Sequence, residues 1–265
     1  NVVLQDGREI KASGNHPFLT ITGWKKLQDL KIKDRIATCR ELPNFKTISQ
    51  DTISIKKAEL IGILLGDGSF RKNPIKVFLG EKKKLIIEKL PDLIEEFNYN
   101  LKVKVRRYKN ENCYTCSFIL KTRKNNPKNE LTAFLESLNL MGRIGNTKEI
   151  PKCILDGSSY VIKACLKGLF GTDGSINYSP SERNKGYVDI SYVSKSEKLV
   201  KQIQYLLLKF GILSRIRLRS VRNQNSTKKF SSWCLEISNI FSKIKFLNTI
   251  GMYDTNKKDY FLSIL

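Results

Sequence analysis

The sequence predicts an α/β (α+β) protein made of two copies of one lobe, each with the element order αββαββα, related by a pseudo-two-fold axis. The first observation behind this prediction is a repeat, because residues 60–68 read LIGILLGDG and residues 166–174 read LKGLFGTDG. The second is that similar helical and strand patterns follow each copy in the same order. A β-rich block precedes both copies, so the predicted domains are residues 1–45, 46–155 and 156–265.

The N-terminal block is predicted to form short β-structure separate from either lobe. Residues 2–11 read as a β-hairpin, with Asp6 and Gly7 as the turn between its two strands. Residues 41–55 are of mixed polarity and include a proline, which indicates a linker to the first lobe.

The elements of both lobes are predicted from hydrophobic periodicity, which repeats every 3.6 residues in a helix and every second residue in a strand. The first lobe is predicted to contain the motif helix at 56–66, a strand at 75–79, a helix at 82–97, strands at 101–106 and 115–120 and a short helix at 130–140. The second lobe is predicted to contain its motif helix, a strand at 187–193, a helix at 196–210, strands at 215–222 and 233–237 and a closing helix at 240–250.

Small residues lie four positions apart in each repeat, at Gly62 and Gly66 in the first copy and at Gly168 and Thr172 in the second. Residues at this spacing share one face of a helix, and small side chains on that face let two helix backbones approach closely. We therefore expect the two motif helices to pack in parallel, with their C-terminal ends together.

Each motif helix is expected to end in an acid held in a Gly-rich turn, Asp67 in one copy and Asp173 in the other. A single such helix end would be read as an ordinary C-cap turn, but two copies in register favour a shared site. Carboxylates and the free carbonyls of a helix end are hard oxygen ligands of the kind that Mg²⁺ accepts. Such a pair suits metal-dependent chemistry on duplex DNA, which is itself roughly two-fold symmetric.

The composition indicates a polyanionic partner. The chain has 48 Lys and Arg against 25 Asp and Glu, a net charge of +23, and neutralised phosphates release counterions that favour binding. Ribosomal and membrane-surface proteins share this excess.

No apolar run is long enough to span a membrane. No signal peptide is visible, and because residue 1 is Asn we expect a fragment or a processed product. Cys113 and Cys116 form the only close cysteine pair, far from the single histidine, so reduced thiols are favoured over zinc.

Basic residues alternate with apolar ones in one strand of each lobe, which places them on one face of a sheet. We expect both rows to contact DNA, because a solvated face ordinarily mixes the two signs of charge. The residues expected at this interface are Lys102, Lys104, Arg106, Arg215, Arg217, Arg219, and Arg222 and Gln224 in the loop that follows.

The two repeats resemble the paired motifs of the LAGLIDADG homing endonucleases of the monomeric type, and the resemblance covers about residues 52–265. It implies that Asp67 and Asp173 are catalytic and that Gly66 and Thr172 offer carbonyl oxygens to the metal. It further implies Mg²⁺ as cofactor, with Mn²⁺ able to substitute, and a monomer that cuts double-stranded DNA at a long pseudo-palindromic site with short 3′ overhangs.

The resemblance also implies catalytic lysines. Lys148 lies in the sequence TKEIP, which matches the family's block for a catalytic-site lysine between the lobes. Lys148 lies six residues after Gly142, and Lys257 lies six residues after Gly251, so the internal repeat makes Lys257 its partner, with Lys258 as an alternative. These ammonium groups would stabilise the charge that develops on the scissile phosphate.

The N-terminal block resembles the splicing half of inteins, most closely those that interrupt replicative DNA helicases of cyanobacteria and plastids. Its sequence GNHPFLT contains His16, the residue that polarises the N-terminal splice junction in that family. This implies an intracellular protein, in a plastid or in cyanobacterial cytoplasm. We expect His16 to be a splicing relic, because the chain starts with Asn1 and ends at Leu265 without a His-Asn terminus.

Two alternatives to an active nuclease are open at this point. The chain could be a DNA-binding protein that keeps the fold without cleavage, or a splicing module whose nuclease has decayed. The presence of both Asp67 and Asp173 favours the nuclease.

Overall fold

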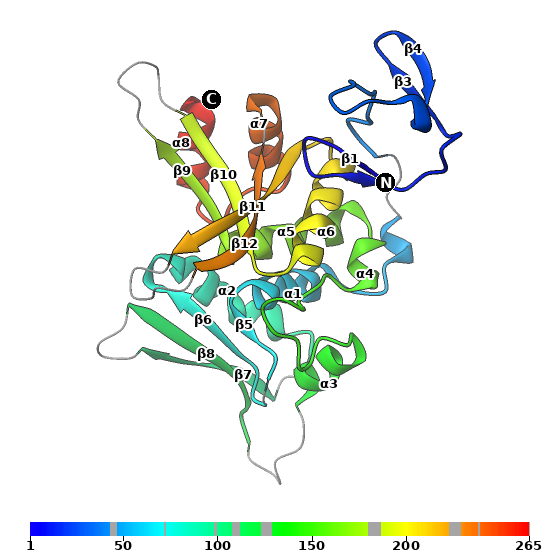
Figure 1. Ribbon diagram of the computed structural model, residues 1–265. Coiled ribbons are helices and arrows are strands. Elements are labelled where there is room, and N and C mark those ends of the chain that lie inside the picture. The colour runs from blue at the N-terminus through cyan, green and yellow to red at the C-terminus, as the bar shows by residue number, and fades with distance from the viewer. Residues whose placement is uncertain are drawn as a thin grey trace.

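The molecule consists of two similar lobes around a central pair of helices, with two small hairpins at one end (Figure 1). This computed structural model describes residues 1–42, 47–71, 73–97, 100–107, 112–122, 129–179, 187–222, 229–237 and 239–264.

The first lobe has the predicted order αββαββα. Its elements are α1 (Ile55–Asp67), β5 (Gly68–Ser69), β6 (Lys76–Gly80), α2 (Lys84–Ile94), β7 (Leu101–Arg107), β8 (Cys113–Leu120) and α3 (Glu130–Ser137). The strands form one antiparallel sheet in the order β5-β6-β8-β7. The helix α2 packs against β6 and β7 of this sheet.

The second lobe repeats this order after a short linking helix, α4 (Lys152–Leu155). Its elements are α5 (Ser159–Thr172), β9 (Gly174–Ser179), β10 (Tyr187–Ser194), α6 (Glu197–Lys209), β11 (Ser214–Arg222), β12 (Lys229–Ile237) and α7 (Ile240–Thr249), followed by α8 (Thr255–Ile264). Its sheet has the matching order β9-β10-β12-β11. The predicted duplication is therefore confirmed, whereas the domain boundaries near residues 45 and 155 stay predictions.

The helices α1 and α5 pack along each other in parallel, as the small residues predicted. A β-carbon added at Gly62 would lie 3.1 Å from the α-carbon of Gly168 and would overlap the carbonyl oxygen of Cys165. One added at Gly168 would lie 2.8 Å from the backbone nitrogen of Ile63. Only glycine fits at these two positions, so the sequence itself sets the distance between the two helices.

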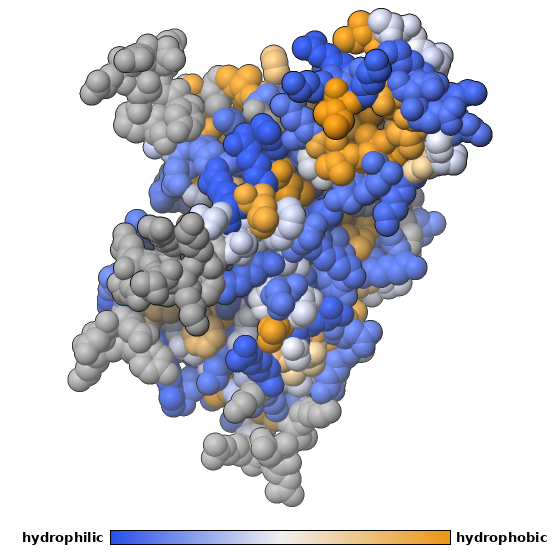
Figure 2. Space-filling view, viewed as in Figure 1, coloured by the Kyte–Doolittle hydropathy of each residue, from blue (hydrophilic) through white to orange (hydrophobic). Residues whose placement is uncertain are grey.

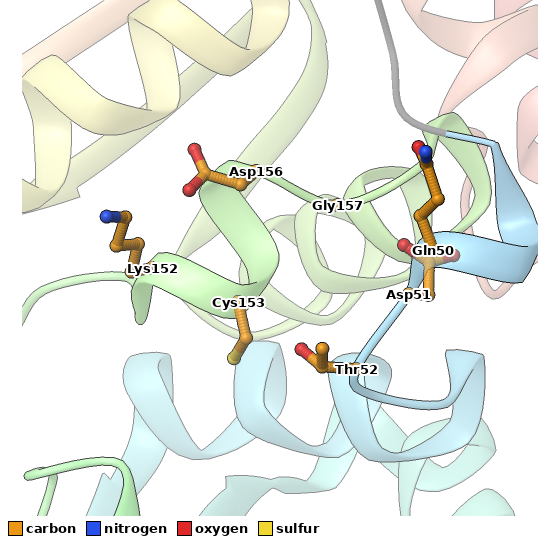
Figure 3. A pocket seen from close by; sticks show the side chains of 7 residues that line it. All are labelled: Gln50, Asp51, Thr52, Lys152, Cys153, Asp156 and Gly157. Atoms are coloured by element: carbon orange, nitrogen blue, oxygen red, sulfur yellow. The ribbon is translucent and has the colours of Figure 1, made fainter.

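The N-terminal ends of this helix pair are joined by a hydrogen bond. The backbone N–H of Ser158, the N-cap of α5, donates to Oδ1 of Asp51 at 2.7 Å. Figure 3 shows the cavity at this end, about 260 Å³ in volume, where Thr52 and Cys153 of α4 point toward one another. Because α1 and α5 run parallel, this cavity lies at the opposite end of the helix pair from Asp67 and Asp173.

The N-terminal block forms two hairpins, and the first of them rests on the second lobe. The hairpin of β1 (Val2–Val3) and β2 (Glu9–Ile10) turns at Asp6 and Gly7 as predicted. The carbonyl oxygen of Asp6 accepts hydrogen bonds from the Ile216 backbone and from Gln204, both at 2.9 Å. The turn therefore caps one end of the edge strand β11.

The second hairpin pairs β3 (Pro17–Thr20) with β4 (Gly23–Lys26) and carries His16 at its base. Several of its large hydrophobic residues face outward, with Trp24 70% and Ile21 78% exposed, whereas Phe18 is buried. Figure 2 shows hydrophobic surface at this end of the molecule. His16 is exposed and meets Phe18 edge to face, 5.2 Å between ring centroids.

Candidate active site

The two predicted acids lie together at the C-terminal ends of α1 and α5. Asp67 is the last residue of α1, and Asp173 is the C-cap residue of α5. The helix ends are in contact, because a β-carbon added at Gly66 would lie 2.7 Å from Cβ of Thr172. Burial, and then the negative charge of Asp67, raise the pKa of Asp173 to about 6.

The Gly-rich turn expected around each acid is present only as the single residue Asp173 in the second copy, and Asp67 is still helical. Gly68 and Gly174 begin the strands β5 and β9, so each helix passes almost directly into a strand. Gly68 has φ −83°, which any residue adopts. These glycines are needed for space instead, because an added β-carbon would lie 2.7 Å from the Leu64 α-carbon at Gly68 and 2.6 Å from the Phe170 α-carbon at Gly174.

Lys148 reaches this site from between the lobes, as predicted. Its ammonium donates to the carbonyl oxygens of Gly66 and Gly68 at 2.6 and 3.1 Å. Its backbone carbonyl accepts a hydrogen bond from the Ser196 hydroxyl at 2.6 Å, which ties this segment to the start of α6. Burial lowers the pKa of Lys148, while the charges of Asp173 and Asp67 oppose that shift.

Lys83 is a site residue that the sequence reasoning missed. It precedes α2, and its ammonium lies 2.6 Å from Oδ2 of Asp67 and 2.5 Å from the carbonyl oxygen of Thr172. It therefore joins the end of α1 to the end of α5. Its only sequence signal is a run of three lysines, which does not single out the middle one.

Lys257, predicted from the internal repeat, is exposed in the first turn of α8. Its backbone N–H donates to Oδ1 of Asp254 at 3.0 Å. Within the described ranges, no hydrogen bond or ion pair connects the side chain of Lys257 or Lys258 to Asp67 or Asp173. The second lysine at the acids is thus Lys83, from the first lobe, and a catalytic role of Lys257 stays a prediction.

A cavity of about 280 Å³ opens beside the acids on the side of the second lobe. It is lined by Leu65, Gly66, Gly145, Lys148, Asp173, Val193, Ser194, Lys195 and Ser232. Asp173 and Lys195 of the second lobe thus share one opening to solvent with Lys148 from between the lobes.

The donor atoms at the helix ends fit a hard divalent cation. They comprise the carboxylates of Asp67 and Asp173 and the carbonyls of Gly66 and Thr172. Across the described part of the chain, no three His, Cys, Asp or Glu residues group together as a metal cluster. Mg²⁺ tolerates so few protein ligands, since it is ordinarily held by one or two carboxylates, with waters and substrate phosphates completing its shell.

The raised pKa of Asp173 predicts that Asp173→Asn stabilises the metal-free protein at neutral pH. The folded state binds this proton more tightly than the unfolded chain, where the pKa is near 3.8. The contribution of Asp173 to stability therefore falls as pH rises from 3.8 through about 6. In EDTA, we expect the variant to gain roughly 2 kcal/mol over wild type at neutral pH and little near pH 4. Urea unfolding at both pH values measures this, and an equal difference at both would contradict it.

The predicted basic row of the first lobe lies on an exposed sheet face. Lys102, Lys104 and Arg106 are exposed on β7, while Leu101 is buried. Cross-strand pairing places Lys104 opposite Ser117 and Ser117 opposite Lys76, so exposed Lys76 extends this face. Directly opposed residues in a ladder point to the same side, so the basic face spans three strands.

The basic row of the second lobe is less uniform than expected. Arg217 and Arg219 are exposed on β11, but both form ion pairs with Glu236 of the neighbouring strand β12. Arg215 lies directly opposite Glu236 in the ladder and is half-buried. This face therefore carries both signs of charge. The sequence of β11 alone could not reveal this, because Glu236 lies on the neighbouring strand β12. The side chain of Arg222, and Gln224 entirely, lie outside what the structure describes.

Comparison with known proteins gives one family match along both lobes. The family model of the LAGLIDADG-like domain matches residues 54–139 and 161–251. A replicative DNA helicase DnaB of Synechocystis sp. is 32% identical over 260 residues, which are 95% of this chain and 28% of the helicase. A replication factor C small subunit of Methanocaldococcus jannaschii is 27% identical over 98% of this chain and 13% of its own length.

Similar relatives carry unrelated names. The ribonucleoside-diphosphate reductase NrdEB subunit alpha of Bacillus subtilis is 24% identical over 100% of this chain and 24% of its own length. The chain thus spans between 13% and 28% of the length of these three relatives. Among solved structures, I-DmoI in complex with DNA and Mn aligns with TM-score 0.48 and 17% identity, covering 74% of this chain and 96% of that chain.

No helix in the described portion is long and apolar enough to cross a membrane.

Proposed function

The chain belongs to the family of LAGLIDADG-like domains, and we propose that it is a site-specific endonuclease that cuts both strands of duplex DNA between its lobes. One observation carries the proposal. Each lobe contributes one acid, Asp67 or Asp173, to a single site at the ends of two helices held together by glycine contacts. A pair of lobes related by a pseudo-two-fold axis fits the symmetry of the DNA duplex.

The residues at the helix ends have distinct proposed roles. Asp67 and Asp173 hold Mg²⁺, or Mn²⁺ in its place, together with the carbonyls of Gly66 and Thr172. When bound there, the metal offsets negative charge on the scissile phosphate and lowers the pKa of a coordinated water. Lys148 is held against the carbonyls of α1 and supplies positive charge next to the acids, so it stabilises charge that develops on the phosphate.

The sheet faces are proposed to bind the DNA on either side of this site. The strands that carry the basic rows, β6 and β7 in the first lobe and β11 in the second, lie on either side of the central helix pair (Figure 1). Both half-sites are then contacted by one chain, so the protein works as a monomer on a long, pseudo-palindromic site.

The origin of the chain is proposed to be an intein. A helicase, a replication factor C small subunit and a reductase subunit align with nearly this whole chain at 24–32% identity, yet the aligned segment makes up only 13–28% of each. A segment common to proteins of such different names is best explained as an insertion rather than as part of any of their activities. The nuclease would then serve homing of that insertion, with the hairpin around His16 as the remnant of its splicing domain.

A plasmid that carries a helicase gene lacking such an insertion tests the proposal. Purified protein with Mg²⁺ is expected to convert it to one linear product, and EDTA is expected to prevent this. Specific binding without cleavage would indicate instead a DNA-binding protein. If the protein neither binds nor cuts the plasmid, the remaining interpretation is a splicing module whose nuclease has decayed.

The arginine row of β11 provides a prediction about DNA binding. Replacing Arg215, Arg217 and Arg219 together with Ala is expected to weaken binding and to flatten its salt dependence, because fewer counterions are released. Each phosphate contact contributes about 0.9 to the slope of log K against log[salt]. Since Arg217 and Arg219 already pair with Glu236, we expect the slope to fall by about one or two rather than three.

The slope is measured by fluorescence anisotropy over a range of salt concentrations. Replacement of Lys25, Lys26 and Lys31 with Ala, in the β3–β4 hairpin and the loop after it, is the charge-matched control. An identical slope for the arginine variant and wild type would show that β11 does not meet the phosphates.

A further inference from the structure

We propose that Lys83 is a resident cation of the metal site, which occupies two of the metal's four proposed ligands, among them the Asp67 carboxylate, and must withdraw before a divalent ion can bind. The inference rests on the proposed function, because it concerns the metal of that same site. Lys83 therefore has a positioning role, because its own position determines whether a divalent ion can bind at the site.

The contacts of Lys83 are those of a cation surrogate. Its ammonium lies 2.6 Å from Oδ2 of Asp67 and 2.5 Å from the carbonyl oxygen of Thr172. One oxygen comes from each lobe, and both belong to the donor set that fits Mg²⁺. The side chains of Lys83 and Asp67 are 27% and 22% exposed, so the pair is partly shielded from solvent.

A divalent ion and this ammonium cannot use the same two oxygens at once. Mg²⁺ requires oxygens at about 2.0–2.1 Å in near-ideal octahedral geometry, and an ammonium on the same oxygens would lie within a few ångströms of it. Like charges at that separation repel strongly in a partly buried site. Binding of one cation therefore excludes the other.

The ammonium also has a function while the metal is not bound. Asp67 and Asp173 repel each other, and the positive charges of Lys148 and Lys83 are what offset this repulsion at Asp173. Because Lys83 also reaches Thr172 of the second lobe, it holds the two helix ends together. Removing it leaves a more negative pair of acids, which attracts a divalent ion more strongly.

Bound DNA would offer the Lys83 ammonium another partner outside the metal site. Lys83 ends the short 3-10 helix Glu81–Lys83, next to exposed Lys82, on a long flexible side chain that can turn toward solvent. A phosphate of bound DNA is an alternative acceptor for its ammonium. Metal loading is thereby coupled to DNA binding, and each is expected to tighten the other by the same factor.

Mn²⁺ binding measured without DNA tests the proposal directly. Free Mn²⁺ is followed by electron paramagnetic resonance in a titration of wild type, Lys83→Met and Lys82→Met. We expect Lys83→Met to bind Mn²⁺ about tenfold more tightly than wild type, within the range of ordinary coupling between sites. Lys82→Met removes the same charge from an exposed neighbour and is expected to bind like wild type. Equal affinities of Lys83→Met and Lys82→Met would overturn the proposal.

A second variant separates this proposal from the function on which it rests. Asp67→Asn combined with Lys83→Met is expected to lose the gained Mn²⁺ affinity. If the tight binding persists without Asp67, the metal lies elsewhere and the proposed site itself is wrong. If Asp67→Asn abolishes binding but Lys83→Met does not strengthen it, only the role of Lys83 fails. Lys83→Gln replaces Lys83→Met if circular dichroism shows that the latter does not fold.

Discussion

Asp67→Asn and Asp173→Asn, each as a single change, are expected to abolish cleavage of both DNA strands and to leave DNA binding intact. Each substitution keeps the shape of the side chain but removes one negative charge from the pair of acids at the helix ends. Loss of one group that stabilises the transition state reduces rates by about 10²–10³-fold. Because the two strands are cut at a shared site, the cleavage rate of both strands should fall. Binding should be retained or strengthened, because a negative charge beside the phosphates is removed.

Conversion of supercoiled plasmid to nicked and linear forms measures this, with binding followed by gel shift. Asp156→Asn is the matched control, because Asp156 is exposed and lies at the opposite end of the helix pair (Figure 3). We expect this control to cut like wild type. Near wild-type cutting of both strands by either helix-end variant would refute the shared site.

Gly168→Ala is expected to cause a large loss of stability, because the added methyl group would meet the backbone of the other helix. The new β-carbon would lie 2.8 Å from the backbone nitrogen of Ile63 and would overlap the carbonyl oxygen of Glu59. Because backbone atoms cannot turn aside as a side chain can, α1 and α5 must separate. Overpacking of a core ordinarily costs about 1–3 kcal/mol, and we expect the upper end of that range.

Urea unfolding of Gly168→Ala and Gly145→Ala measures the difference. At Gly145 the nearest atom to an added β-carbon is the side-chain Cδ of Lys195 at 3.7 Å, an ordinary contact. The control is therefore expected to unfold like wild type. Equal free energies of unfolding for the two variants would show that the helices are not held at the glycine contact.

The lobes could be predicted because local pattern and tertiary packing agree in the repeated motif. Gly62 and Gly168 indicate which face of α1 and of α5 meets the other helix. The same motif therefore predicted both helices, their contact and the position of the acids at their ends. Buried strands such as β10 were located within one residue, because Val188, Ile190 and Tyr192 alternate with less buried neighbours. The expectations about Asp67 and Asp173 thus required only the comparison of two short segments of the sequence.

Features that depend on distant contacts could not be predicted in this way. Lys83 meets Thr172 through a contact across 89 positions of sequence, and nothing in its neighbourhood distinguishes it from the lysines on either side. Glu236 neutralises the arginine row only through the register of β11 and β12. The helix α8 buries a single residue, Phe261, and therefore has almost no hydrophobic periodicity.

Sequencing both DNA ends after cleavage of the helicase-gene plasmid is the most direct test of the account. If one site at the ends of α1 and α5 cuts both strands, every product ends at a single position, and the two strand breaks are offset to leave a short 3′ overhang. Cuts scattered along the plasmid, or breaks in one strand alone, would contradict a shared site built from Asp67 and Asp173.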